Sequence, residues 1–143
     1  MPRKQSLKRR TPEQDFHKRV AQLLDTVLIA PAFYTTFPAG GGGKIRGAIL
    51  KSMGLKPGMP DLLVFWSDAR PDGTRPHILG LELKSKTGSL SKEQKAISFA
   101  MHANGMHYEV CRGEEDVIRA LSLHGCSFVT LHFQGAAERR VTA

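Results

Sequence analysis

The sequence predicts a mixed α/β fold in which a small mixed β-sheet is flanked by helices. Three observations predict this class. Segments with apolar residues at helical spacing alternate with short apolar runs of strand length. The runs at 61–66 and 77–84 are joined by only ten residues, which favours an antiparallel pair. The second run is followed by a helical segment and another strand, which is the arrangement of a parallel crossover.

The first element is a long helix that begins after Thr11. The run Thr-Pro-Glu-Gln supplies an N-cap, a proline at the first helical position, and Gln14 three residues past the cap. Apolar residues then recur at helical spacing up to Leu28. Pro31 is expected to end this helix.

A strand and a short basic helix follow. Residues 33–37 are aromatic and β-branched, which favours a strand. Four glycines at 40–43 precede a helix expected at about residues 44–53, with Gly54 as its C-cap.

The centre of the sheet is predicted from two apolar runs. Residues 61–66 are apolar after the first position, which is typical of a strand buried on both faces. Residues 67–76 are polar and contain proline and glycine, so we expect a loop. Residues 77–84 form the next strand.

The second half of the domain repeats helix and strand. Ser91 is expected to cap a helix that ends at Gly105, and residues 106–111 form a strand. Three acids at 114–116 favour the start of a last helix, which ends near Gly125. Residues 127–133 are one more strand or a tail segment.

Length and charge bound the function. The 143 residues suit a single domain at 11–133, between a disordered basic tail at 1–10 and a frayed tail at 134–143. The net charge is +8, and five positive charges lie in the first ten residues, which favours nucleic acid as partner and not a membrane. No apolar run suits a membrane helix or a secretory signal, and two cysteines suit a cytoplasmic protein.

The strand at 77–84 carries a charged pair. Because side chains alternate between faces, Leu79, Leu81 and Leu83 point one way. Glu82 and Lys84 point the other way, side by side. On its own, this pattern is best explained by a solvated face with a cross-strand ion pair.

Asp61 gives the charged pair a second interpretation. In an antiparallel pairing, the start of the strand at 61–66 lies opposite the end of the strand at 77–84, which brings Asp61 near Glu82 and Lys84. Two neighbouring carboxylates repel each other, and Mg²⁺ or Mn²⁺ would resolve that repulsion. As a bland alternative, Asp61 is a turn residue after proline.

Glu13 is a third candidate acid. It shares a helical stripe with Phe16 and Val20, so we expect it on or beside the face that packs inward. It either complements the helix dipole or lies near the metal.

Several segments together resemble the VRR-NUC domain, the virus-type replication-repair nuclease branch of the PD-(D/E)XK superfamily. These are Gly40–Gly43, Gly54-Leu-Lys-Pro-Gly-Met-Pro-Asp61-Leu, Leu81-Glu-Leu-Lys84, Gly88-Ser-Leu-Ser-Lys-Glu-Gln94, Gly105, and Glu109-Val-Cys-Arg112. The resemblance covers about residues 13–123 and is closest to the standalone phage and prophage members.

The resemblance implies a restriction-endonuclease-like α-β-β-β-α-β core and a set of site residues. Asp61 and Glu82 match the metal-binding acids, and Lys84 matches the catalytic lysine. Glu13 matches the acid of the first helix, although Phe16-His17 stands where members often carry Leu-Gln. Gln94 matches a family glutamine, but Ser91 and Gln94 also form a capping box, so both roles stay open. The carbonyl of Leu83 would complete the metal site.

The remaining candidates are DNA contacts. Backbone amides of the glycine loop and nearby lysine or arginine side chains suit phosphate groups. The expected contacts are Gly41, Gly42, Lys44, Arg46, Lys51, Lys86 and Lys92.

The implied activity is a metal-dependent endonuclease acting on branched DNA, with Holliday junctions as the expected target. Symmetric cuts favour a homodimer, with its interface on the first helix or on the last helix and tail. The alternatives are a flap or restriction-like nuclease, and a non-catalytic nucleic-acid-binding module on the same fold.

Overall fold

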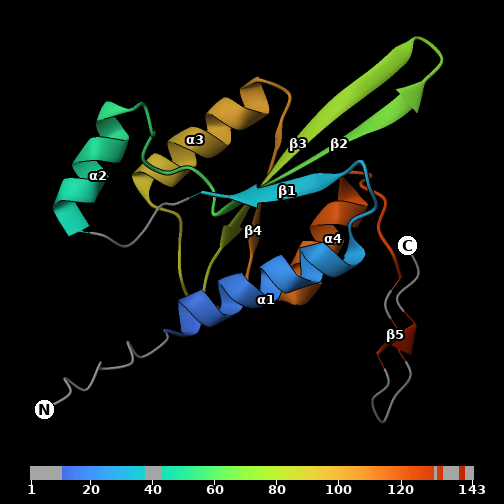
Figure 1. Cartoon of the computed structure of the whole chain (residues 1–143), viewed down its shortest axis with the longest axis horizontal. Helices are drawn as coiled ribbons and strands as arrows, with labels where there is room; N and C mark the ends of the chain where they lie inside the picture. Colours follow the sequence, from blue (N-terminus) through green and yellow to red (C-terminus); the bar gives the residue numbers. More distant parts are fainter. Residues whose placement is uncertain (1–10, 38–42, 131, 134–138, 141–143) are drawn as a thin grey trace, which may run out of the picture.

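A four-stranded sheet in the order β1-β2-β3-β4 organises the protein (Figure 1). The computed structural model describes residues 11–37, 43–130, 132–133 and 139–140. The strands are β1 (Phe33–Thr36), β2 (Leu62–Arg70), β3 (Gly73–Leu83) and β4 (His107–Cys111). The first two pairings are antiparallel and the β3–β4 pairing is parallel. The predicted fold class and both predicted strand pairings are therefore confirmed.

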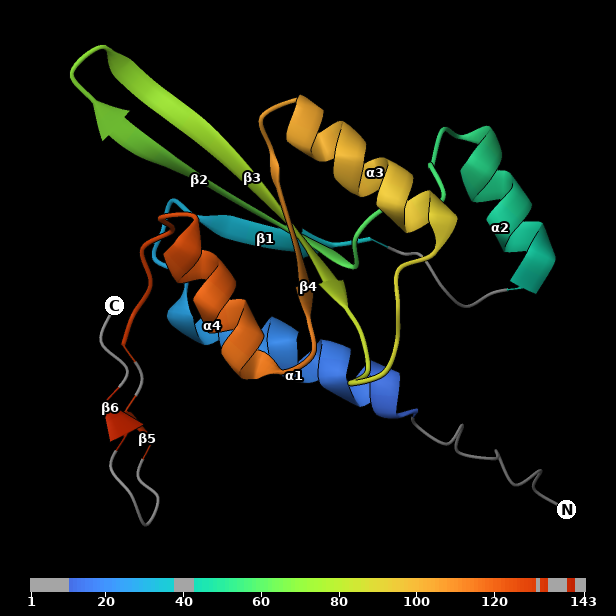
Figure 2. The same cartoon turned by 180° about the vertical axis from the view of Figure 1, so that it is seen from behind.

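Helices cover both faces of this sheet. Figures 1 and 2 show α1 (Pro12–Val27) and α4 (Glu114–Leu123) together on one side, and α3 (Lys92–Ala103) on the other. Helix α2 (Gly43–Ser52) lies apart from the sheet and buries none of its residues. A separate two-stranded pairing joins β5 (His132–Phe133) to β6 (Arg139–Arg140).

The helix boundaries follow the predicted caps, with one exception. Thr11 and Gln14 form the expected capping box at the start of α1. The helix ends at Val27, however, and not at Pro31. Leu28 leaves the helical conformation because it forms an isolated β-bridge with Phe128.

The segment at 67–76 is not the loop that its polarity predicts. It continues both strands of the β2–β3 hairpin, with Ser67 opposite Pro76 and Arg70 opposite Gly73. This extension projects beyond the rest of the sheet (Figure 2), so residues there are mostly exposed and show no apolar alternation. An exposed two-stranded extension is as polar in sequence as a loop, so composition does not distinguish the two.

The hydrophobic core lies between the sheet and the α1–α4 pair. Leu79 and Leu81 are fully buried there, and Leu83 packs against the same cluster, which confirms the predicted face. Glu82 and Lys84 therefore project from the opposite face, toward α3. The buried core residues are Val20, Leu24, Val27, Leu62, Val64, Trp66, Leu79, Leu81, Cys111, Val117, Ala120, Leu121, Cys126 and Phe128.

A stack of aromatic rings closes the end of this core that is farther from Glu82. Trp66, His77, His107 and His124 stack at centroid separations between 4.1 and 5.9 Å. His77 bonds to Asp68 at one end, and His124 bonds to Glu109 at the other. The stack thus ties β2, β3 and β4 to the end of α4.

Several sequence predictions concern residues that the structure does not describe. The expected tail at 1–10 and the glycines Gly41 and Gly42 lie outside the described residues, as does most of 134–143. Within the described residues, no helix is both long and apolar enough to span a bilayer.

Candidate active site

Asp61 lies immediately before β2 and faces the end of β3. Its Oδ2 accepts a hydrogen bond of 2.7 Å from the backbone N–H of Leu83. The paired part of the hairpin ends at Leu62 and Leu81, so the Asp61 carboxylate takes the place of the next strand partner. Because the N–H and C=O of one strand residue point to the same edge, the Leu83 carbonyl also faces this side.

Pro60 fixes Asp61 from behind. Its ring is fully buried and packs directly on Gly80 of β3. A Cβ atom at Gly80 would lie 2.8 Å from Pro60 Cγ, so only glycine admits this contact. The Pro60-Asp61 pair is therefore held against β3 by packing as well as by hydrogen bonding.

Glu82 is a buried acid next to Asp61. Only 3% of the residue is exposed, and its Oε1 accepts a 2.7 Å hydrogen bond from Nε2 of Gln94. Burial first, and then the negative charge of Asp61, raise the pKa of Glu82 to about 7, while the Lys84 ammonium acts in the opposite direction. The solvated-face interpretation of this strand is therefore wrong.

Lys84 completes the charged cluster. Its Nζ lies 3.6 Å from Oε1 of Glu82, and its side chain is 20% exposed. The ammonium group is thus held at the rim of the site, where a substrate phosphate could reach it. The sequence pattern placed Asp61, Glu82 and Lys84 together, and the structure does so.

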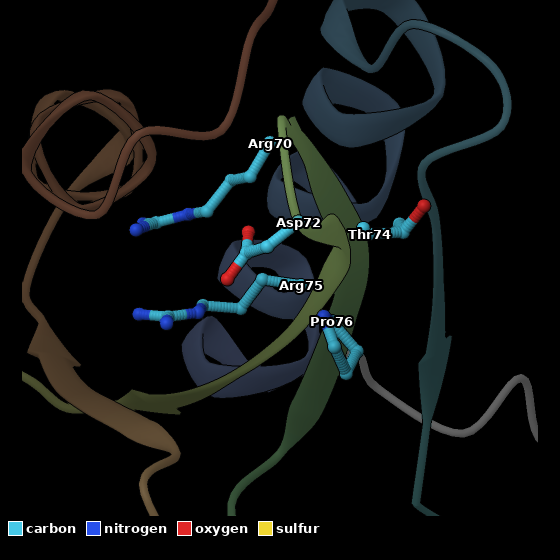
Figure 3. A pocket seen from close by; sticks show the side chains of 6 residues that line it. Arg70, Asp72, Thr74, Arg75 and Pro76 are labelled. Carbon is cyan, nitrogen blue, oxygen red and sulfur yellow. The ribbon is translucent and has the colours of Figure 1, made fainter.

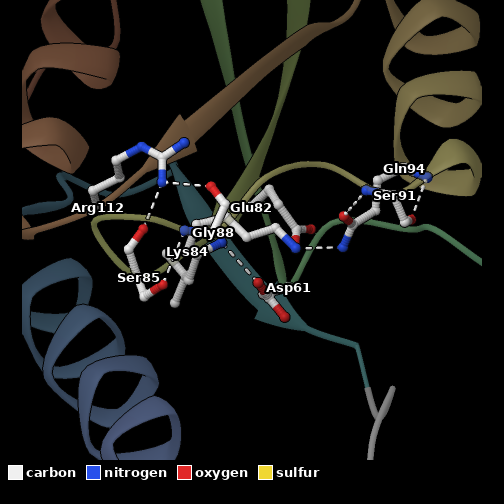
Figure 4. Close-up of polar contacts among 9 residues, drawn as sticks. Asp61, Glu82, Lys84, Ser85, Gly88, Ser91, Gln94 and Arg112 are labelled. Carbon is white, nitrogen blue, oxygen red and sulfur yellow. Dashed lines mark hydrogen bonds and ion pairs between the residues drawn. The ribbon is translucent and has the colours of Figure 1, made fainter.

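Gln94 forms the capping box that the sequence predicts, and it also bonds to an acid of the candidate site. Its Oε1 accepts from the Ser91 N–H at 2.8 Å, which caps α3, and its Nε2 donates to Glu82. Only one orientation of the amide satisfies both bonds, because a carboxylate accepts and a backbone N–H donates. The Gln94 side chain therefore caps the start of α3 and also orients the carboxylate of Glu82 (Figure 4).

Gly58 brings Gln94 to this position. Its φ is +87°, and a Cβ atom there would lie 2.4 Å from the Glu93 backbone. The loop that precedes Asp61 therefore packs directly on the first turn of α3. The Pro-Gly-Met-Pro-Asp run thus positions two site residues. It contains Asp61 itself, and its Gly58 packs on the turn of α3 that carries Gln94.

Arg112 supports the turn that follows Lys84. Its Nη1 donates to the carbonyls of Ser85 and Gly88, at 2.7 Å for the latter (Figure 4). The turn carries Lys86, whose side chain is exposed. Lys86 therefore lies two residues from Lys84 on a braced segment.

Tyr108 and Glu82 share the α3 side of the sheet. Tyr108 lies opposite Gly80 in the parallel register, two positions from Glu82. Burial and the negative charges of Glu82 and Asp61 raise the pKa of Tyr108. Within the described residues, neither the Tyr108 hydroxyl nor Oε2 of Glu82 makes a well-formed hydrogen bond, although the hydroxyl and the carboxylate are near enough to shift each other's pKa.

Glu13 does not point inward as expected. Its side chain is exposed in the first turn of α1, before the turns that carry the buried Val20 and Leu24. The α1 residue that reaches the rim of the site is instead His17, one turn later, which bonds to Thr36. The sequence analysis missed His17 as a site residue, although its position four residues after Glu13 puts both on one helix face.

The acidic pair suits a hard divalent cation. Oε2 of Glu82 is buried and unpaired within the described residues, and the Asp61 and Glu82 charges repel each other. In those same parts of the chain, no three His, Cys, Asp or Glu side chains are arranged to hold a metal. Two carboxylates with one carbonyl nevertheless suit Mg²⁺, which usually keeps several waters and binds substrate phosphate.

The expected DNA contacts outside the glycine loop are exposed. Lys44, Arg46 and Lys51 lie on α2, while Lys86 and Lys92 lie between Lys84 and the start of α3. Lys86 lies two residues after Lys84 and Lys92 lies two residues before Gln94, so both are close along the chain to the candidate site.

An open pocket occurs at the hairpin tip, far from this cluster. Arg70, Asp72 and Arg75 project to one side of the hairpin, and Thr74 to the other (Figure 3). The tip is nine residues of strand from Asp61, or about 30 Å. The pocket therefore takes no part in the site.

The comparisons with known proteins agree with this geometry. The family model described as the VRR-NUC domain matches residues 38–115, which include Asp61, Glu82, Lys84 and Gln94 but exclude Glu13. A solved structure described as a VRR_NUC domain protein aligns with 81% of this chain and 89% of its own, at 19% identity and a TM-score of 0.60. That likeness shows the fold. No curated protein matches the chain.

Proposed function

Because this chain belongs to the VRR-NUC domain family, we propose that it is a divalent-metal-dependent nuclease that hydrolyses phosphodiester bonds in DNA. The observation that supports this most strongly is the meeting of Asp61, Glu82 and Lys84 at one end of the β2–β3 pair. The same three residues, with Pro60, form the pattern of the PD-(D/E)XK superfamily, to which we also assign the chain.

Each site residue has a distinct role in this proposal. Asp61, Glu82 and the carbonyl of Leu83 would hold Mg²⁺ or Mn²⁺, with Glu13 acting through water. When bound, the cation lowers the pKa of its coordinated water and neutralises charge that develops on the phosphate. Gln94 holds Oε1 of Glu82 and so leaves Oε2 available.

Lys84 supplies the positive charge of the chain itself. Its ammonium is held near Glu82, so it is ready to orient the attacking water or to stabilise negative charge on the phosphate. Because Lys84 is largely shielded from solvent, this electrostatic effect is stronger than at an open surface.

A close pair of acids, of which Glu82 is buried, is difficult to explain in a purely DNA-binding module. Negative charges repel the phosphate backbone, and burial of Glu82 disfavours its charged form. These costs have a purpose when a cation is held between the acids and the scissile phosphate. The acidic pair thus favours the nuclease over the non-catalytic alternative.

We propose branched DNA as the substrate, with the four-way junction preferred, on the basis of the family resemblance. A junction needs two symmetric cuts, which suits a two-fold homodimer. The core residues of α1 and α4 are buried, but Leu123 at the end of α4 is 68% exposed, so the last helix stays a candidate for this contact. Helix α2 and the residue after it offer another exposed apolar stripe, in which Ile45 and Met53 are each 78% exposed and Ile49 is 53% exposed.

The dimer is tested by light scattering of wild type and Ile49→Glu. We expect a wild-type dimer and a monomeric variant, because a charge in a self-facing apolar stripe meets its own copy across the two-fold axis. A wild-type monomer that still cuts both strands of a junction contradicts the homodimer.

The activity is tested with three labelled DNAs, namely a four-way junction, a flap and a linear duplex, in Mg²⁺, Mn²⁺ or EDTA. Wild type is compared with Asp61→Asn, which keeps the side-chain shape but removes the charge. Asp72→Asn is the matched control, since it makes the same chemical change at the exposed hairpin tip.

We expect cutting that requires the metal, survives in Asp72→Asn, and falls at least about 100-fold in Asp61→Asn. The ranking of the three DNAs then distinguishes a junction-resolving enzyme from a flap or restriction-like nuclease. Binding of DNA without cutting in either metal contradicts the nuclease and favours the non-catalytic module.

A further inference from the structure

We propose that His17 is a positioning residue that connects α1 to the metal-binding Asp61 through Thr36, in a defined tautomer. The inference rests on the proposed nuclease function. His17 is half-buried, and its Nε2 lies 2.9 Å from Oγ1 of Thr36 at the end of β1. The same Oγ1 lies 3.1 Å from the carbonyl oxygen of Asp61.

The direction of the two hydrogen bonds that link His17, Thr36 and Asp61 follows from which atoms carry a proton. The Asp61 carbonyl can only accept, so the Thr36 hydroxyl donates its single proton to it. Thr36 Oγ1 must then accept from His17, which requires a hydrogen on Nε2. In the neutral imidazole, Nδ1 therefore carries the lone pair.

The hydrogen bonds from His17 through Thr36 hold the backbone of Asp61, while other contacts hold its side chain. The Asp61 carbonyl accepts from the Thr36 hydroxyl and from the Phe37 N–H at 3.1 Å. The carboxylate accepts from the Leu83 N–H on the opposite side. With both ends held, the second carboxylate oxygen has little freedom, as a preorganised metal ligand requires.

His17 also accounts for the role of α1 after Glu13 proved to be exposed. The first turn of α1 does not pack on the core, so Glu13 can act only at a distance. His17 lies one turn closer to the buried Val20 and makes the direct contact with β1. The helix therefore supports the metal site from behind its ligands and not as a ligand itself.

Three variants separate positioning from simple packing. Thr36→Val removes the hydroxyl with little change in volume, at an exposed residue where the fold tolerates it. His17→Leu removes the donor, and His17→Gln keeps a donor at a similar reach. Wild type and variants are compared by cleavage rate, by Mn²⁺ affinity from the paramagnetic signal of free Mn²⁺, and by melting temperature.

We expect Thr36→Val and His17→Leu each to reduce Mn²⁺ affinity and kcat by about 10-fold or more, with KM for DNA nearly unchanged. His17→Gln should recover most of both. The double variant should be no more impaired than the more impaired of the two single variants, since both substitutions interrupt the same series of hydrogen bonds. Additive losses, or no recovery in His17→Gln, would mean a merely structural role.

A second readout does not depend on cleavage. Long-range ¹H–¹⁵N correlation spectra at pH 8 report which nitrogen of a neutral histidine carries the proton. We expect Nε2–H for His17 in wild type and a mixture of tautomers in Thr36→Val. Nδ1–H in wild type overturns the inference even if the enzyme is active. If wild type cuts no DNA, the nuclease proposal fails, while the tautomer and Mn²⁺ results still decide the link to Asp61.

Discussion

At Glu82, a negative charge is placed where the protein interior disfavours it. The residue is 3% exposed, and burial together with Asp61 raises its pKa to about 7. A carboxyl whose pKa is raised on folding contributes stability that is fully present below its ordinary value of 4.5 and is lost as the pH rises through 7. Above pH 7, the metal-free protein is therefore less stable than it would be without this charge.

Glu82→Gln should consequently stabilise the metal-free protein while it removes activity. Gln has the same shape but no charge, so at pH 8 in EDTA we expect a gain of roughly 1–3 kcal/mol. At pH 4, the Glu82 carboxyl is largely neutral in both the folded and the unfolded protein, so the difference should nearly vanish. Urea unfolding at the two pH values measures this. A less stable variant at pH 8 would contradict the unfavourable charge at Glu82.

Gln94 allows its two roles to be separated experimentally. Gln94→Ala removes the bond to Glu82 and one bond of the α3 cap, whereas Ser91→Ala removes only the cap bond to the Gln94 N–H. We expect both to lower stability by about 1 kcal/mol. Only Gln94→Ala should reduce cleavage, by about 10-fold or more. Equal activity loss in both would show that the helix cap alone matters.

The residue scale also shows what sequence can and cannot predict. Asp61, Glu82 and Lys84 were predictable because strand alternation and antiparallel register place them together. The cap formed by Gln94 was predictable from the Ser91 spacing, but its bond to Glu82 was not, because that bond depends on how α3 packs on the sheet. The prediction that Glu13 faces inward was wrong, because helical spacing shows which face of α1 a residue lies on. It does not show whether the sheet extends far enough to cover the first turn of that face.

Among the elements, the histidine stack couples three strands to α4. Desolvation lowers the pKa of His107, and the nearby His124, His77 and His102 lower it further, while Glu109 opposes them. A base with a lowered pKa binds its proton more readily in the unfolded chain. The stability that depends on neutral His107 is therefore present above the ordinary value of 6.5 and is lost as the pH falls below it.

His107→Gln should accordingly flatten the acid side of the stability profile. We expect wild type to lose stability between pH 7.5 and pH 5, and the variant to lose less, because glutamine does not titrate. His102→Gln should flatten the profile less, since His102 is exposed on α3 and has the smallest effect of the three histidines on His107. Unfolding free energies at the two pH values provide the measurement, and parallel profiles for wild type and His107→Gln would contradict it.

Element boundaries were predictable where a cap or a turn residue marks them. Thr11, Ser91 and Gly105 each mark a helix end in the sequence, and the structure follows them. The end of α1 at Val27 was not predictable, because it depends on a bridge to Phe128, a hundred residues later. The hairpin beyond residue 66 was missed because its pairing is backbone to backbone and leaves no apolar pattern.

For the whole molecule, the net charge of +8 and the exposed lysines predict strong salt dependence of DNA binding. In the Asp61→Asn background, which prevents cutting, Lys86→Ala and Lys92→Ala should each reduce the salt slope of log K by about 0.9 if each contacts one phosphate. Arg75→Ala at the hairpin tip is the control, with no expected change. If neither lysine substitution changes the salt slope of log K, the DNA does not contact Lys86 or Lys92.

The overall architecture was predictable because the order of elements admits few arrangements. Two apolar strands joined by a short connection pair antiparallel, and the helix between β3 and β4 requires a parallel crossover. The position of α2, by contrast, depends on contacts that its sequence does not specify, since none of its residues is buried.

The two acids of the site come from opposite arms of one hairpin whose tip at Asp72-Gly73 is exposed. A chain divided at that tip would carry Asp61 in one fragment and Glu82, Lys84 and Gln94 in the other. Neither half would hold a pair of acids, so strand breakage in DNA would report the rejoining of the two halves. Under the proposed nuclease function, the geometry that assembles the site would thus also allow the protein to be used as a split reporter.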